Sequence, residues 1–391
     1  MKIAVIKERR PNEARVATSP DVVKRFKKLG FDVSIETGAG LGASIVDQAF
    51  IDAGATIADE AESAVKNANI VLKVQRPLSA EEGGIDEIEL LEPGMILVGT
   101  MQSLSHPDQA KKLAESKITV FAMELLPRIS RAQSMDVLSS QSSLAGYKAV
   151  LDACNEYTRA FPMMMTAAGT IPPARVLVLG AGVAGLQAVA TAKRLGAVVH
   201  AYDVRPAVKE QVESLGAKFV EVDTAAAADA ETSGGYAKEM AEDYKVKQDQ
   251  VLADVVANTD IVICTALIPG RPAPVLVTPE MVRNMKSGSV IVDLAVEQGG
   301  NCPLSELGKV VEKEGVILVG HANVPSRIAT DASAMYAKNL YNFIEPMVNA
   351  ETKDLSINWE DEIISGSLIS RDGSIVHPML SLDIDNEERG K

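Results

Sequence analysis

A glycine-rich turn that directly follows an apolar run is the feature that most constrains the fold of this chain. Residues 176–179 are Val-Leu-Val-Leu, and they lead into Gly180, Gly182 and Gly185, which are spaced as G-x-G-x-x-G. Asp203 follows about 20 residues further on, at the end of the next predicted strand. A strand, a glycine turn, a helix, a second strand and an acid in this order are typical of a βαβ unit that binds a dinucleotide.

The spacing of the glycines has a physical explanation in terms of a bound pyrophosphate. Gly180 permits the tight turn, Gly182 lets the backbone approach the phosphates, and Gly185 lets the helix pack near the strand. The N–H groups at the start of this helix, including those of Val183 and Ala184, and the helix dipole favour phosphate. These five residues are therefore predicted to hold the pyrophosphate.

The residues at the end of the second strand bear on which dinucleotide binds. The Asp203 carboxylate can accept hydrogen bonds from a ribose diol and would repel a 2′-phosphate, so NAD is favoured over NADP. Arg205 leaves this choice partly open, because an arginine at such a position can pair with a 2′-phosphate. Val204 lies between the two and belongs to the same predicted adenosine site.

The composition excludes several classes of partner and ligand. Among 391 residues, 39 Lys and Arg stand against 53 Asp and Glu, a formal net charge of −14, so neither nucleic acid nor an anionic lipid surface is expected to bind. Cys154, Cys264 and Cys302 are widely spaced and form no C-x-x-C motif, which fits a reducing cytosol and predicts no metal site. The N-terminus lacks a secretory pattern and no apolar stretch suits a bilayer. We therefore expect a soluble protein without direct membrane insertion.

Short apolar runs alternate with helical patterns in two series. The first series comprises residues 3–7, 33–36, 70–74, 95–99 and 118–123, and the second comprises 175–179, 198–202, 218–222, 261–266, 289–294 and 316–319. Such alternation is typical of parallel α/β domains. The sequence therefore predicts the α/β class, with two doubly wound parallel-sheet (Rossmann-like) domains and a cleft between them.

Helical patterns between and after the two series set the expected domain boundaries. Residues 140–160 favour a connecting helix, and residues 331–348 form a helical pattern that is expected to return the chain to the first domain. We therefore expect a discontinuous N-terminal domain at 1–139 plus 327–391 and an NAD(H)-binding domain at 140–326. The tail predicts a hairpin around Asp372 and Gly373.

Three segments resist a simple interpretation. Residues 127–141 lack a steady apolar period and predict an ordered polar loop, in which Gln133 could bind a carboxamide and Arg128 a phosphate or carbonyl. The same loop could equally be an interdomain hinge. Residues 225–250 form a charged insertion that is either a lid or a solvated helix with a loose turn. The run of three methionines at 163–165 is interpreted as packing material.

Two cations and two acids remain as further candidates. Arg15 and Lys73 could bind a substrate carboxylate or stand in structural salt bridges. Asp293 and Glu297 flank a turn at a strand end, and we expect one of them to be functional and the other structural.

Six segments of the chain carry a family resemblance. They are Lys7-Glu8-Arg9-Arg10-Pro11, Lys73-Val74-Gln75-Arg76-Pro77, Pro127-Arg128-Ile129-Ser130-Arg131-Ala132-Gln133-Ser134-Met135-Asp136, Gly234-Gly235-Tyr236-Ala237-Lys238-Glu239-Met240, Ala266-Leu267-Ile268-Pro269-Gly270 and Asp293-Leu294-Ala295-Val296-Glu297. Together they resemble the NAD(H)-binding component, domain I, of proton-translocating nicotinamide nucleotide transhydrogenase, whose fold is shared with alanine dehydrogenase. The likeness covers essentially the whole chain.

The resemblance implies a role for each group of predicted residues. It implies that the polar loop orients the nicotinamide and its ribose through Arg128, Gln133, Asp136 and Ser139. It implies that the glycine turn and Asp203 hold the pyrophosphate and adenosine ribose, with Ala266 and Leu267 nearby. Tyr236 is then expected in a mobile loop that closes over the nucleotide.

The resemblance also implies an activity and partners. The family's domain I is a homodimer that binds NADH and passes hydride to NADP⁺ on a separate domain III, coupled to proton movement through a membrane domain II. We therefore expect an NAD(P)⁺ transhydrogenase (Re/Si-specific, proton-translocating) that is active only with partner subunits. NADP(H) would bind only on the partner. The expected location is the bacterial cytoplasm, at the inner face of the plasma membrane through those partners.

Two alternatives remain for the function. An alanine dehydrogenase-like amino-acid oxidoreductase needs a group that moves protons at the reacting carbon. In that family a histidine lies where this chain has Gln102, and an aspartate lies where it has Glu297. Hydride exchange between two nicotinamides moves no such proton and needs only alignment, so the substitutions favour transhydrogenase. The second alternative is a nucleotide-sensing or assembly module that has lost its chemistry.

Overall fold

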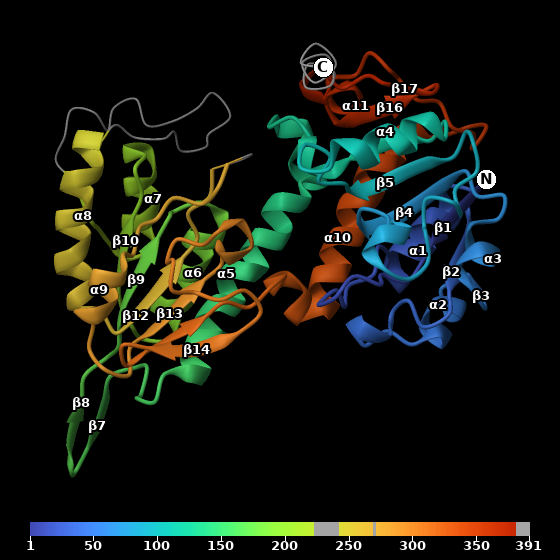
Figure 1. Cartoon of the computed structure of the whole chain (residues 1–391). Coiled ribbons are helices and arrows are strands. Elements are labelled where there is room, and N and C mark those ends of the chain that lie inside the picture. The colour runs from blue at the N-terminus through green and yellow to red at the C-terminus, as the bar shows by residue number, and fades with distance from the viewer. Residues whose placement is uncertain (223–241, 269–270, 381–391) are drawn as a thin grey trace. The chain divides into compact units, whose positions relative to one another are not determined.

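The computed structural model describes residues 1–222, 242–268 and 271–380 (Figure 1). These residues divide into two compact units, one formed by Met1–Gln141 with the described residues from Ser326 onward, the other by Ser142–Pro325. Tyr236 and most of the predicted lid lie outside the described residues.

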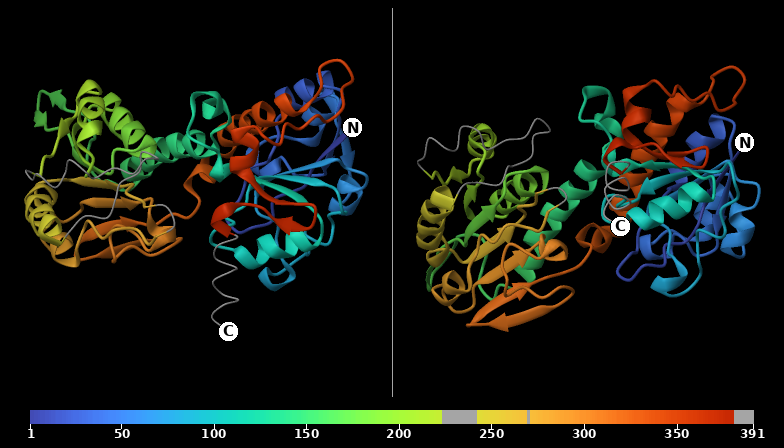
Figure 2. Two further views of the ribbon diagram at one scale, coloured as in Figure 1. Left: turned by 90° about the horizontal axis from the view of Figure 1, so that it is seen from above. Right: turned by 45° about the horizontal axis from the view of Figure 1, so that its top comes forward.

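The first unit is built on an eight-stranded sheet in the order β17-β16-β6-β5-β4-β1-β2-β3. Its strands are β1 (Lys2–Val5), β2 (Asp32–Glu36), β3 (Thr56–Ala58), β4 (Ile70–Gln75), β5 (Ile96–Thr100), β6 (Thr119–Ala122), β16 (Leu368–Arg371) and β17 (Ser374–Ile375). The five strands that the first apolar series predicts are confirmed, and they run parallel. The predicted tail hairpin is also confirmed, because β16 and β17, drawn in red, extend the sheet beyond β6 (Figure 2).

Helices cover both faces of this sheet. They are α1 (Pro20–Lys28), α2 (Asp47–Asp52), α3 (Ala61–Val65), α4 (Pro107–Glu115), the start of α5 (Val137–Glu156), α10 (Ala329–Ile344) and α11 (Glu362–Ser367). Successive residues of β1 point to opposite faces, so Ile3 and Val5 pack in a core with α1 and α10, while Ala4 packs in a core with α3 and α4. A strand buried on both faces reads as a continuous apolar run, as the sequence does here.

The second unit is built on a seven-stranded sheet in the order β11-β10-β9-β12-β13-β15-β14. Its strands are β9 (Arg175–Leu179), β10 (Val198–Tyr202), β11 (Lys218–Phe219), β12 (Ile261–Cys264), β13 (Val290–Asp293), β14 (Val310–Lys313) and β15 (Val316–Val319). All neighbours are parallel except β14 and β15. The strand order reverses beside β9, and in such sheets the ligand crevice lies outside the carboxyl ends of the strands at that point.

Helices also cover both faces of the second sheet (Figure 1). The core on one face includes residues of α5, α6 (Val183–Arg194) and α7 (Lys209–Ser214). The core on the other includes residues of α8 (Glu242–Ala257) and α9 (Pro279–Arg283). None of the described helices is both long and apolar enough to cross a membrane.

A small hairpin of β7 (Met164–Thr166) and β8 (Gly169–Ile171) overturns the interpretation of the methionine run as packing. Met163, Met164 and Met165 are exposed, Met165 to 75%. The hairpin pairs only with itself, so no core of its unit lies against these side chains.

The prediction of a loop over residues 127–141 is partly wrong. Ser130–Met135 forms a 3-10 helix, and α5 already begins at Val137. Asp136 accepts hydrogen bonds from the backbone N–H of Ser139 at 2.9 Å and from its hydroxyl at 2.5 Å. An aspartate that accepts from the third residue of a helix is a favourable N-cap, which explains why the helix starts here.

Candidate nucleotide site

The glycine turn after β9 has the close contacts that its spacing predicts. Gly180 has a φ of +93°, which disfavours any residue with a Cβ. A Cβ at Gly185 would lie 1.8 Å from the carbonyl oxygen of Gly180, so only glycine allows α6 to start this close to β9. Thr265 donates hydrogen bonds to the carbonyl oxygens of Leu179 at 3.2 Å and Gly180 at 2.9 Å, which fixes the turn against the end of β12.

The start of α6 faces open space. A Cβ at Gly182 would meet no atom within 4 Å, and no side chain caps the helix there. Val183 is exposed and Ala184 is half-buried. A 12-residue helix with an uncapped, accessible N-terminus offers backbone N–H groups and a positive dipole end to an anion. This arrangement suits a pyrophosphate.

Asp203 lies directly beside the turn. Its Oδ2 accepts a hydrogen bond from the backbone N–H of Ala181 at 2.7 Å. Its two oxygens also accept from the Arg205 side chain, Oδ1 from Nε at 2.9 Å and Oδ2 from a terminal nitrogen at 2.8 Å. Val204, between them, is half-buried. The acid therefore connects the end of β10 to the turn, where an adenosine ribose would lie next to the pyrophosphate.

The segment after β12 forms a further wall of the site, and Asn301 holds it in place. Asn301 is fully buried, accepts from the backbone N–H of Ala266 at 3.0 Å, and donates to the carbonyl oxygens of Ala266 and Pro274, both at 2.8 Å. Leu267 follows as an exposed apolar side chain. The sequence analysis noted the turn that contains Asn301 but gave the residue no role. A buried amide after two glycines at a strand end was the available signal.

Asp293 and Glu297 differ in the way that was expected of the pair. Asp293 is buried and accepts hydrogen bonds from the backbone N–H groups of Ala295, Asn301 and Cys302 at 3.0 to 3.2 Å. Burial raises the pKa of Asp293, although these hydrogen bonds oppose the shift. Glu297 is exposed. Asp293 therefore has a structural role in shaping the turn after β13.

Gly146 of α5 was missed by the sequence analysis. A Cβ at Gly146 would lie 2.0 Å from the carbonyl oxygen of Ala184, so the glycine lets α5 pack directly against the first turn of α6. It supports the nucleotide site without facing it. A glycine inside a strong helical pattern was the signal, because such a residue costs helix stability unless close packing requires it.

The polar loop belongs to the first unit and presents exposed side chains. Arg128 and Gln133 are exposed, whereas Asp136 and Ser139 are half-buried at the start of α5. The loop backbone is fixed from α10, since the carbonyl oxygen of Ser134 accepts from two asparagine side chains of that region, Asn339 and Asn342, each at 2.9 Å. Gln133 thus projects from a rigid support.

Arg15 and Lys73 stand in buried ion pairs, which is one of the two roles that the sequence left open. The Arg15 guanidinium donates to both oxygens of Glu13, at 2.8 and 2.6 Å. Lys73, 2% exposed, lies 2.7 Å from Glu87 and 3.3 Å from Glu8. Burial acts to raise the pKa of Glu13, but the hydrogen bonds and charge of Arg15 outweigh it and lower that pKa to about 2. Burial raises the pKa of Glu8.

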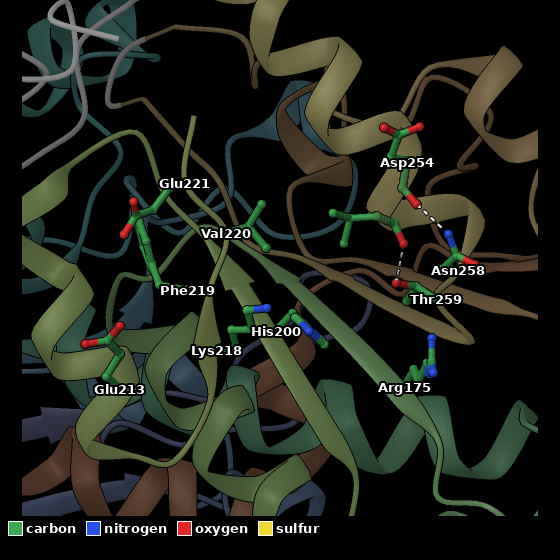
Figure 3. A pocket seen from close by; sticks show the side chains of 11 residues that line it. Arg175, His200, Glu213, Lys218, Phe219, Val220, Glu221, Asp254, Asn258 and Thr259 are labelled. Carbon is green, nitrogen blue, oxygen red and sulfur yellow. Dashed lines mark hydrogen bonds between the residues drawn. The ribbon is translucent and has the colours of Figure 1, made fainter. Parts of the chain in front are cut away.

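A cavity of about 650 Å³ lies at the opposite end of β9 from the glycine turn (Figure 3). Arg175, the first residue of β9, lines it together with His200, Lys218 and the end of α8 around Asp254. Burial and the nearby charges of Lys218 and Arg175 lower the pKa of His200. No residue of the glycine turn lines this cavity, so it is separate from the candidate site.

Comparison with known proteins agrees with this geometry. Residues 4–145 match the model of the alanine dehydrogenase/PNT N-terminal domain, and residues 149–378 match that of the alanine dehydrogenase/PNT C-terminal domain. An NAD(P) transhydrogenase subunit alpha chain of Rhodospirillum rubrum is 62% identical over 381 residues, which cover 97% of this chain and 99% of the relative.

Two solved structures have the same fold. The transhydrogenase of Sinorhizobium meliloti is 51% identical with a TM-score of 0.86, and the match covers 96% of this chain and 100% of that one. An L-alanine dehydrogenase is 26% identical with a TM-score of 0.81, and the match covers 99% of each chain. The chain therefore belongs to the alanine dehydrogenase/PNT family and, within that family, to the alpha subunits of NAD(P) transhydrogenase.

Proposed function

We propose that this chain is the NAD(H)-binding component of a proton-translocating transhydrogenase. It would hold NADH and deliver hydride directly to NADP⁺ on a domain III that another subunit provides. The observation that carries the proposal is the accessible start of α6 at Gly182 with Asp203 beside it, since this pair offers both a pyrophosphate and a ribose subsite.

The reaction needs alignment rather than acid–base chemistry. A hydride, with its electron pair, leaves C4 of the reduced nicotinamide and forms a bond to C4 of the oxidised one, which gives NAD⁺ and NADPH without a proton at either carbon. The role of the protein is therefore to orient one ring and to exclude water. We assign the orienting role to Arg128, Gln133, Asp136 and Ser139. Their support on α5 and α10 favours this role.

The alanine dehydrogenase alternative is disfavoured by three side chains. Gln102 is exposed and cannot act as a general base. Lys73 and Arg15, the cations that could bind an amino-acid carboxylate, are paired with Glu87 and Glu13 of the chain itself.

We further propose that the chain forms a homodimer and that the β7–β8 hairpin contributes to the dimer. The exposed methionines favour a partner surface, because methionine adapts to apolar contacts. A second copy is the occupant that the family resemblance implies. Membrane domain II would associate through the partner subunits, which would keep this chain at the cytoplasmic face of the membrane.

A reconstitution experiment tests the hydride-transfer proposal. The chain alone should bind NADH, detected by nucleotide fluorescence, and should reduce no NADP⁺. Addition of a separate domain III protein loaded with NADP⁺ should give rapid transfer. Binding without transfer would favour the sensing alternative. Rapid alanine-dependent NADH formation by the chain alone would favour the dehydrogenase alternative.

A further inference from the structure

The contacts of Asp203 and Arg205 decide a question that their order in the sequence leaves open. Four donors point at the Asp203 carboxylate, namely the backbone N–H groups of Ala181 and Arg205, at 2.7 and 2.9 Å, and two nitrogens of the Arg205 side chain, at 2.9 and 2.8 Å. A carboxylate has about four lone-pair sites, so these donors fill it. The Asp203 side chain is 5% exposed and that of Arg205 is 13% exposed.

The arginine is therefore turned toward the acid. Its Nε and one terminal nitrogen form the two-pronged edge that would otherwise bind a phosphate in the same bidentate manner. A 2′-phosphate could reach this edge only by separating Arg205 from Asp203. It would then leave a largely buried carboxylate without its donors and next to a dianion.

A ribose diol meets a different situation. Each hydroxyl both donates and accepts, so the diol can donate to Asp203 while it accepts from the arginine. The ion pair can adjust around the diol without being lost. A phosphate accepts only, and it competes with Asp203 for the same guanidinium.

We propose that Arg205 is a latent receptor for a 2′-phosphate, which Asp203 keeps from binding one. The same carboxylate then selects NAD(H) in two ways, by repelling a 2′-phosphate and by retaining the arginine that would bind it. This inference rests on the proposed function in one respect, namely that the adenosine ribose lies at Asp203.

A double-mutant cycle on the full chain tests the inference. The variants are Asp203→Asn, Arg205→Gln and the double variant, and NADH, NADPH, AMP and adenosine 2′,5′-bisphosphate serve as ligands. Asparagine keeps an oxygen that can accept from Ala181, so the turn is preserved. Arg175→Gln is the control, because it removes a guanidinium at the far end of β9.

Asp203→Asn should tighten the binding of NADPH and of adenosine 2′,5′-bisphosphate by about tenfold or more, the size of a charge-assisted hydrogen-bond pair. The gain should vanish when Arg205→Gln is added and should persist when Arg175→Gln is added. An equal gain with and without Arg205, or no gain at all, would overturn the inference.

Arg205→Gln alone gives an independent test that does not depend on the folding of the Asp203 variant. It should change the affinity for NADPH by less than about twofold, because the arginine does not bind the phosphate in the unaltered protein. A tenfold loss would contradict the inference. Failure of the unaltered chain to bind NADH or AMP would instead contradict the proposed function, so the two failures are distinguishable.

Discussion

Asp136 caps helix α5 through Ser139, whose backbone N–H and hydroxyl both donate to its carboxylate, at 2.9 and 2.5 Å. The residue that is proposed to contact the nicotinamide ribose therefore also fixes the start of a helix. Asp136→Ala should lower the free energy of unfolding by about 1 kcal/mol, the usual value of an N-cap, whereas Asp136→Asn should retain most of it. Urea unfolding of the nucleotide-free chain measures both.

Ser139→Ala serves as the control for this prediction, since it removes the hydroxyl donor and keeps the backbone one. A role of Asp136 limited to the cap would leave NADH affinity the same in Asp136→Ala and in the unaltered chain. A loss of affinity that Asp136→Asn does not restore would support contact with the nucleotide.

Two glycines of the turn are expected to respond in opposite ways to alanine. At Gly182 a Cβ meets open space and φ is −75°, so Gly182→Ala should fold with nearly unchanged stability. It should weaken NADH binding by about tenfold or more, because the methyl group occupies the position of the phosphates. At Gly185 the Cβ would lie 1.8 Å from a carbonyl oxygen, so Gly185→Ala should lose both stability and binding.

Urea unfolding and NADH titration of the two variants measure these effects. If Gly182→Ala bound NADH normally, the pyrophosphate would lie elsewhere. Gly299→Ala is not a suitable control, because its φ is +97°; Gly42→Ala is also unsuitable, because its Cβ would meet Ala14. Val183→Ala, which changes an exposed side chain and leaves the backbone unaltered, is the matched control.

Strands buried on both faces could be predicted from the sequence because their apolar runs are continuous, as in Val176–Leu179 of β9. The edge strand β14 could not, since Val310–Lys313 is a half-exposed pair of valines followed by two charges. The three-residue β3 is too short to leave a pattern. Local pattern identifies elements with a buried face, and edge strands are specified by the neighbour they pair with.

The candidate site shows the same limit. The glycines and Asp203 could be predicted because their spacing along the chain encodes the turn. The roles of Asn301 and Gly146 depend on contacts with Ala266 and Ala184, which are distant in sequence. The orientation of Arg205 toward Asp203 likewise depends on side-chain geometry that spacing does not encode.

The buried ion pair of Glu13 and Arg15 should make stability depend on pH in the acid range. The folded-state pKa of Glu13 is lowered from 4.5 to about 2, so the ionised form is favoured on folding. Its contribution is fully present above the unfolded pKa and is lost as the pH falls from about 4.5 through about 2. The shift corresponds to a contribution on the order of 3 kcal/mol.

Glu13→Gln tests this expectation. The difference in unfolding free energy between the variant and the unaltered chain should be largest above about pH 5 and should shrink toward about pH 2. Guanidinium unfolding at several pH values measures it. Glu360→Gln, at an exposed acid of the same unit, should show no such trend. A difference that stays constant over this range would mean that Glu13 is not ionised preferentially in the folded chain.

Lys73 should be more sensitive than its lack of exposure alone suggests. It is the cation between Glu8 and Glu87, all three with side chains at most 2% exposed. Lys73→Met should cost about 3 to 5 kcal/mol, because it leaves two buried carboxylates without their partner. Adding Glu87→Gln should recover part of this loss, which thermal or urea unfolding would show. Equal stability of the single and double variants would mean that Glu87 is not paired with Lys73.

Gln133 gives the most direct test of the orienting role proposed for the polar loop. Its exposed side chain projects from a 3-10 helix whose backbone is held by Asn339 and Asn342. Gln133→Asn shortens the amide by one methylene, which should misplace the nicotinamide ring while most nucleotide contacts remain. The rate of hydride transfer to NADP⁺ on domain III should therefore fall by about tenfold or more, with less than about a threefold change in NADH affinity. Single-turnover transfer and NADH titration measure the two quantities separately, and Ser130→Ala in the same 3-10 helix is the control. An equal loss in rate and affinity would assign Gln133 to binding alone, since an orienting group acts on the geometry of the transition state more than on the bound ground state.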